Sequence, residues 1–158
     1  MHSLVVYDTT FGITRSIAEV IERELEHRGS VRLLDAEEAL AREARPTGLL
    51  VVGGPTQGHR MTPALQAYVS WLASTRATGP FAAFDTRLRM ARLLSGSAAR
   101  QAARTLRHAG MLLVVAPESF FVTRHGPTLE PGELERASSW AAGMGALAAV
   151  GDYPVVGT

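Results

Sequence analysis

Apolar residues follow two different patterns along the chain. Short continuous apolar runs alternate with longer stretches in which apolar residues recur every three or four positions. A short run is typical of a strand buried on both faces, and the longer spacing predicts an amphipathic helix. The runs predict strands over residues 4–7, 31–34, 49–52, 81–84 with no defined limit toward residue 88, and 111–116 resuming at 119–122 after Pro117.

Helices are predicted between these runs. In the first, Ile13, Ile17 and Val20 share one face with later apolar residues, and Glu19 and Glu22 lie on the other. Asp35, Thr62 and Ser97 are residue types that cap helix N-termini, and Pro63 suits a first helical position. The predicted helices cover residues 13–26, 36–40, 63–72, 98–108 and 133–147.

Five alternations of strand and helix predict βαβ crossovers, and therefore a parallel sheet covered by helices on both faces. We expect one α/β domain over residues 1–148 and a tail over 149–158. For a five-stranded sheet in the order 2-1-3-4-5, ligands bind beyond the carboxyl ends of strands 1 and 3, where the order reverses. The two most polar connections in the chain follow these two strands.

The amino-acid composition excludes several classes of reaction and of binding partner. The chain has 158 residues, a net charge of +1, no Cys and no Lys. The absence of Cys excludes disulfides and thiolate metal sites, and the absence of Lys excludes Schiff-base catalysis and a Walker-type phosphate loop. The charge balance argues against nucleic acid or a membrane as partner. No run reaches the roughly 20 apolar residues of a membrane span, and we expect a cytoplasmic location.

The first polar connection has the composition of an anion site. Thr9, Thr10, Gly12 and Thr14 surround the start of a predicted helix, where backbone N–H groups lack partners and the helix dipole favours negative charge. A phosphate monoester would fit there without any Lys. The alternative is that Thr9 or Thr10 only caps the helix.

The second connection, residues 53–63, is long for an α/β loop, which usually has about 2–6 residues. Its glycines leave backbone amides and carbonyls accessible to the polar edge of a flat heterocycle. The alternative is a surface loop that ends at the Thr62 cap.

These segments resemble a known family. Residues 6–14, Val-Tyr-Asp-Thr-Thr-Phe-Gly-Ile-Thr, resemble the phosphate-binding segment of flavodoxin-like domains, whose pattern is Thr/Ser-x-Thr-Gly-x-Thr. They look most like the flavodoxin domains of flavodiiron proteins, in which Tyr-Asp-Thr precedes the loop. Residues 52–56, Val-Gly-Gly-Pro-Thr, with Pro63 beginning the next helix, resemble the second flavin loop of the same family.

The resemblance implies non-covalent binding of FMN. It places the phosphate on the first loop, one ring edge on the second loop, and a third flavin loop after the fourth strand. The implied cofactor-binding residues are Thr9, Thr10, Phe11, Gly12, Ile13 and Thr14 in the first loop, Pro55, Thr56, Gln57, Gly58 and His59 in the second, and Asp85, Thr86 and Arg87 in the third.

The chain departs from the family pattern in three ways. Phe11 stands where a Thr usually precedes the motif glycine, the third loop offers no aromatic residue to stack on the ring, and the chain is not acidic. Arginines flank the loops instead. We predict that these cations stabilise an anionic reduced flavin and raise its potential: Arg60, Arg87, Arg89 and Arg92.

Two functions follow. The first is an FMN protein that transfers electrons to a redox partner protein or reduces a small-molecule acceptor. The alternative is a module that has lost FMN and acts in interaction or regulation, which Phe11 and the missing aromatics favour. A phosphoacceptor receiver domain is excluded, because Asp8 stands alone and the required Lys is absent. The five His residues are scattered without metal-ligand spacing.

Overall fold

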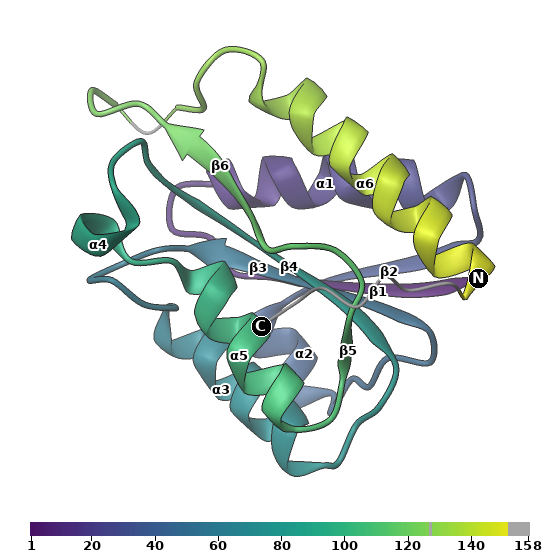
Figure 1. The fold of residues 1–158 in the computed structure, drawn as a ribbon. Coiled ribbons are helices and arrows are strands. Elements are labelled where there is room, and N and C mark those ends of the chain that lie inside the picture. Colours follow the sequence, from purple (N-terminus) through teal and green to yellow (C-terminus); the bar gives the residue numbers. More distant parts are fainter. Residues whose placement is uncertain (127, 152–158) are drawn as a thin grey trace.

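The computed structural model describes residues 1–126 and 128–151, and every side chain in that range except those of Arg92 and Leu93. Six strands in this part of the chain form one sheet, in the order β2-β1-β3-β4-β5, with β6 beside β4 (Figure 1). All pairings between these strands are parallel, which confirms the predicted α/β sheet and its order. The strands are β1 His2–Tyr7, β2 Ser30–Asp35, β3 Leu49–Pro55, β4 Pro80–Leu88, β5 Leu112–Leu113 and β6 Glu118–Val122.

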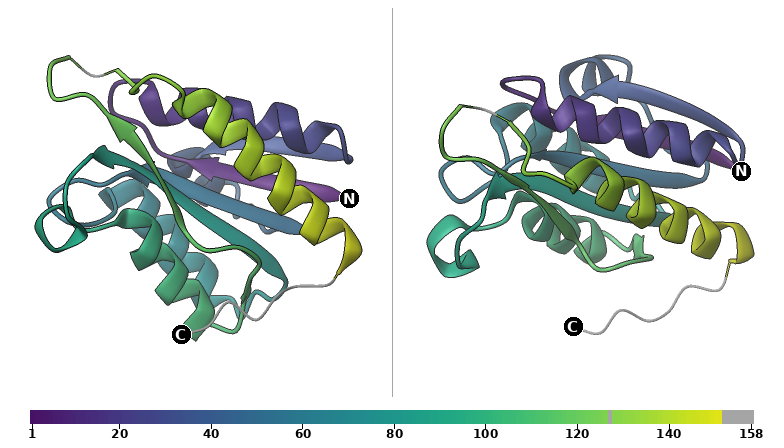
Figure 2. Two further views of the ribbon diagram at one scale, coloured as in Figure 1. Left: turned by 45° about the horizontal axis from the view of Figure 1, so that its top comes forward. Right: turned by 90° about the horizontal axis from the view of Figure 1, so that it is seen from above.

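Helices cover both faces of the sheet (Figures 1 and 2). Helices α1, Ile13–Glu26, and α6, Glu133–Val150, pack side by side on one face. Helices α2, Ala36–Ala41, α3, Pro63–Ser74, and α5, Ala98–His108, bury the other face. The short helix α4, Arg92–Ser95, lies beyond the end of β4 and was not predicted from the sequence.

Three element boundaries differ from the predictions. Strand β4 continues through Asp85, Thr86 and Arg87, because it pairs with β3 on one side and with β6 on the other. These residues therefore belong to a central strand and not to a loop. The predicted fifth strand is two strands, since the chain around Pro117 leaves the ladder between Leu113 and Glu118. Helix α6 runs beyond residue 147 to Val150, and residues 152–158 of the predicted tail lie outside the described residues.

Gly53 fixes the packing at the end of β3. A Cβ atom on Gly53 would lie 2.2 Å from the ring of Phe84 on the neighbouring strand. That ring packs edge-on against Phe120 at 6.1 Å and Trp140 at 6.2 Å, measured between centroids. The absence of a side chain at residue 53 of β3 therefore leaves room for an aromatic cluster with one ring each from β4, β6 and α6.

The helix starts agree with the predicted caps at three positions. The side chains of Asp35, Thr62 and Ser97 each accept a hydrogen bond from the backbone N–H three residues ahead. Helix α1 is different, because its N-cap residue is Gly12 and no side chain caps it. None of the described helices is long and apolar enough to cross a bilayer.

Candidate functional site

The first loop, residues 8–14, presents a row of backbone donors. Gly12 has a left-handed φ of 82°, and its own N–H donates to Thr9 Oγ1 at 2.9 Å. Among the described residues, no acceptor faces the backbone N–H of Thr10, Phe11, Ile13 or Thr14. Four amides at the positive end of α1 are therefore left for a ligand, and such a group of donors suits an anion.

The threonine hydroxyls tie the first loop to its neighbours. Gln57 Nε2 donates to Thr10 Oγ1 at 2.6 Å, and Thr14 Oγ1 shares a buried 2.8 Å hydrogen bond with Thr86 Oγ1. The oxygens of Thr9 and Thr10 act as acceptors, so the proton of each hydroxyl remains free to donate. The loop thus combines a fixed position with two side-chain donors beside the free amides.

A cavity of about 420 Å³ opens beside the first loop. This volume lies in the range of roughly 300–1,000 Å³ that is typical of small-molecule sites. Four segments line it: Thr9, Thr10, Phe11, Ile13 and Thr14; Pro55, Thr56 and Gln57; Thr86, Arg87 and Leu88; and Val122, Thr123, Arg124 and Gly126. The sheet therefore brings ten of the fourteen predicted residues to one cavity. Gly12, Gly58, His59 and Asp85 do not line it.

The second loop, predicted to border a flat ring, contains a tight turn at residues 57–60. Gln57 and Arg60 pair through two backbone hydrogen bonds, of 2.9 and 3.1 Å, and the residues between them, Gly58 and His59, both have positive φ. The backbone of His59 forms a β-bridge with Gly96 ahead of α5. Gly58 and His59 do not line the cavity, and Pro55, Thr56 and Gln57 are the residues of this loop that border it.

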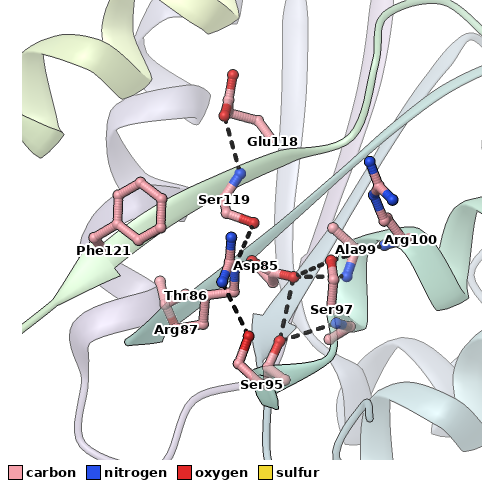
Figure 3. A network of polar contacts seen from close by, with 12 residues as sticks. Asp85, Thr86, Arg87, Ser95, Ser97, Ala99, Arg100, Glu118, Ser119 and Phe121 are labelled. Atoms are coloured by element: carbon pink, nitrogen blue, oxygen red, sulfur yellow. Dashed lines mark hydrogen bonds and ion pairs between the residues drawn. The ribbon is translucent and has the colours of Figure 1, made fainter. Parts of the chain in front are cut away.

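Asp85 has a structural role beneath the site (Figure 3). It is fully buried, and its Oδ2 accepts hydrogen bonds from the Thr56 hydroxyl at 3.2 Å and the Ala99 amide at 3.1 Å, as well as from Ser97. Thr56 Oγ1 in turn accepts from the Ala98 amide at 2.9 Å. The carboxylate joins the end of β3 to the start of α5. It was predicted to lie in a flavin loop, but strand β4 turns it toward α5.

Arg87 lies in the cavity wall and is almost completely buried. Its guanidinium donates to Ser119 Oγ and Ser95 Oγ at 3.0 Å each (Figure 3). It also donates to the Met90 carbonyl at 2.8 Å. Its Nε also lies 4.0 Å from Asp85 Oδ1, in a long ion pair. Arg87 therefore places a positive charge at the cavity and also holds α4 and β6 against β4.

The other predicted cations are placed differently. Arg89 pairs with Glu130 at 2.8 Å and stacks over the Phe121 ring at 4.1 Å. Arg60 is exposed in the turn of the second loop and does not line the cavity. The side chain of Arg92 lies outside the described part of the chain.

Phe11 leaves the cavity open. Its side chain is 71% exposed at the rim, so the aromatic ring that replaces a Thr does not fill the space beside the amides. The substitution removes one hydroxyl without blocking the site. Phe11 therefore gives less support to a module that has lost FMN than the sequence alone suggested.

The fourth segment of the cavity wall was not predicted from the sequence. Val122, Thr123, Arg124 and Gly126 follow β6 and reach the cavity over the carboxyl edge of the sheet. The available signal was a polar segment with a glycine directly after an apolar run, at the same sheet edge as the first two loops. In the described residues, no group of three His, Asp or Glu side chains is arranged to hold a metal ion.

Comparison with known proteins defines the fold. No protein-family model and no curated protein matches the sequence. Among solved structures, a flavodoxin from the domain Archaea is 20% identical with a TM-score of 0.72, over 92% of this chain and 97% of that one. The flavodoxin of Streptococcus pneumonia TIGR4 is 15% identical with a TM-score of 0.75, over 92% and 99% of the two chains.

The resemblance extends to part of a larger protein. Rubredoxin oxygen:oxidoreductase from Desulfovibrio gigas is 18% identical with a TM-score of 0.73, over 94% of this chain but 36% of that one. This chain therefore corresponds to about a third of that enzyme. Together these structures show that the chain has the flavodoxin-like fold.

Proposed function

We propose that the chain binds FMN non-covalently in the cavity and acts in electron transfer, as an electron carrier or a small flavin-dependent reductase. The observation that carries the proposal is the group of unpartnered backbone amides at residues 10, 11, 13 and 14, on a fold shared with flavodoxins. The acceptor would be a redox partner protein or a small molecule.

The residues present fit such a cofactor. The free amides and the hydroxyl protons of Thr9 and Thr10 suit a phosphate without any Lys. Pro55, Thr56 and Gln57 would border the ring, and Arg87 lies in the same wall. Bound FMN would supply the exchange of one or two electrons, so the residues of the chain need only bind the cofactor, orient it and set the local charge.

The proposal is tested by titrating the protein with FMN and following the quenching of flavin fluorescence. The decisive pair of variants is Thr10→Glu and Thr10→Gln, which have nearly the same shape and differ by one negative charge. Gly12 is a poor choice, because its φ of 82° would add backbone strain to any effect of charge.

We expect the wild-type protein to bind FMN. A carboxylate among the phosphate donors should weaken binding by about a hundredfold, close to 3 kcal/mol, and the glutamine variant by less than about tenfold. A wild-type protein that does not quench the fluorescence of added FMN would refute FMN as the cofactor. Equal affinities of the two variants would refute the position of the phosphate.

A further inference from the structure

We propose that Arg124 supplies the positive charge that pairs with the phosphate of the cofactor, from a segment that lines the same cavity as the first loop. This inference rests on the proposed function, and it assigns a binding role to a segment for which sequence analysis predicted none. It concerns the hairpin after β6, of which the structure describes residues 122–126 and 128–129, on the way from β6 to α6.

The topology places this hairpin near the phosphate end of the cavity. Strands β1 and β6 are parallel parts of one sheet, so α1 and the segment leading to α6 both begin at its carboxyl edge. Helices α1 and α6 then pack side by side on the same face (Figure 2). The first loop and the hairpin that precedes α6 therefore border the cavity from the same side of the sheet, whereas the second loop leads to α3 on the opposite face.

The hairpin is braced, so it can hold a side chain in position. Thr123 is central to it: its N–H donates to the Thr128 carbonyl at 2.8 Å, and its hydroxyl contacts the Gly126 carbonyl at 2.9 Å and the Thr128 hydroxyl at 2.8 Å. A bridge between Val122 and Leu129 closes the base. Arg124 follows the most connected residue of this hairpin and lines the cavity.

Arg124 is also the uncommitted cation of the site. Arg87 is bonded to Ser119, Ser95 and the Met90 carbonyl. Arg15, in the first turn of α1, pairs with Glu19 at 2.8 Å, and this hydrogen bond raises the pKa of Arg15. Arg124 is exposed, and among the described residues it makes no hydrogen bond or ion pair.

The chemistry of the ligand favours this pairing. A phosphate monoester carries roughly −1.5 to −2 charge near pH 7, and backbone amides alone contribute only partial charges. The first loop offers no cation to the cavity, and Phe11 has replaced one hydroxyl donor. A guanidinium in the same cavity as the amides would form charge-assisted hydrogen bonds with phosphate oxygens and compensate for the lost donor.

The test compares FMN with riboflavin, which has the same ring and ribityl chain but no phosphate. Dissociation constants for both flavins are measured by fluorescence quenching at low ionic strength, for the wild type, Arg124→Gln and Arg124→Lys. Arg60→Gln is the matched control. It removes the same charge from the same edge of the sheet, at an exposed residue outside the cavity wall.

We expect Arg124→Gln to weaken FMN binding by about 10- to 30-fold and to leave riboflavin binding within about twofold of wild type. Arg124→Lys should recover part of the loss, and Arg60→Gln should change FMN binding by less than about threefold. Equal losses for FMN and riboflavin, or no loss for FMN, would overturn the role of Arg124 while leaving FMN as the cofactor. A wild-type protein that binds neither flavin would instead refute the proposed function.

Discussion

A hydrogen bond between Asp85 and Ser97 joins strand β4 to the start of helix α5 beside the candidate site. The Ser97 hydroxyl donates to Asp85 Oδ2 at 2.6 Å, and Ser97 is also the N-cap of α5. The buried carboxylate thus ties the sheet to the first turn of that helix, where the helix dipole favours negative charge.

Removing this carboxylate should destabilise the fold. In Asp85→Ala, two hydroxyls and one amide lose their acceptor, and we expect a loss of roughly 2–4 kcal/mol in the free energy of unfolding. Urea denaturation measures it. Asp35→Ala, at the exposed cap of α2, is the control and should cost about 1 kcal/mol. Equal losses in the two variants would show that the buried network adds nothing.

The contact between Gly96 and His59 should be intolerant of a side chain. A Cβ on Gly96, whose φ is 70°, would lie 2.4 Å from the carbonyl oxygen of His59. We expect Gly96→Ala to cost more than the roughly 1–2 kcal/mol of backbone strain alone. Gly58→Ala separates the two effects, because Gly58 also has positive φ but faces open space. If both variants lose the same stability in urea, the contact is not tight in solution.

Glu133 should make stability depend on pH. Burial opposes ionisation of Glu133, but hydrogen bonds from Arg136 and the Phe121 amide outweigh it and lower its pKa. A lowered folded-state pKa stabilises the fold above the unfolded-state pKa of about 4.3, and this stabilisation disappears as the pH falls through the folded-state value.

The measurement is urea unfolding of wild type and Glu133→Gln between neutral pH and about pH 3. The stability difference should be largest at neutral pH and should shrink below about pH 4.3. Glu135→Gln, exposed in the same helical turn, changes the net charge equally without removing these bonds. A difference for Glu133→Gln that is independent of pH would contradict the expectation.

Arg87 should affect the redox potential of bound FMN. A buried cation in the cavity wall favours an anionic reduced flavin, so Arg87→Gln should lower the hydroquinone potential by roughly 30–60 mV, up to about a tenfold change for one electron. Potentiometric titration of the FMN-loaded protein measures it. Ser119→Ala removes a partner of Arg87 but keeps the charge, and serves as the control. Identical potentials for wild type and Arg87→Gln would refute the effect.

Local sequence signals were sufficient for much of the fold. The caps at Thr62 and Ser97 and the apolar runs of β1 and β3 are determined by nearest neighbours and by burial, and the structure confirms them. The first loop was also readable, since threonines and a glycine between a buried strand and an amphipathic helix indicate free amides at a known sheet edge.

The residues whose positions were not predicted from the sequence are placed by tertiary contacts. Asp85 is polar and follows Phe84, so it reads as the start of a loop, yet β6 pairs with β4 and extends that strand to Leu88. The side chain of Asp85 is then buried, and it accepts a hydrogen bond from the Ala99 amide in the first turn of α5. Arg124 was missed because the packing of α6 beside α1, which is not encoded near residue 124, brings its hairpin over the cavity.

The space left by Gly53 couples the residue types that can evolve at positions 53 and 84. Because the Phe84 ring occupies the volume of a Cβ at residue 53, a larger residue there is acceptable only after residue 84 has become smaller. A smaller residue 84 in turn deprives Trp140 and Phe120 of a packing partner. Homologues that lack this glycine should therefore carry paired changes on β4 and α6, and a single substitution at either strand position would be selected against on its own.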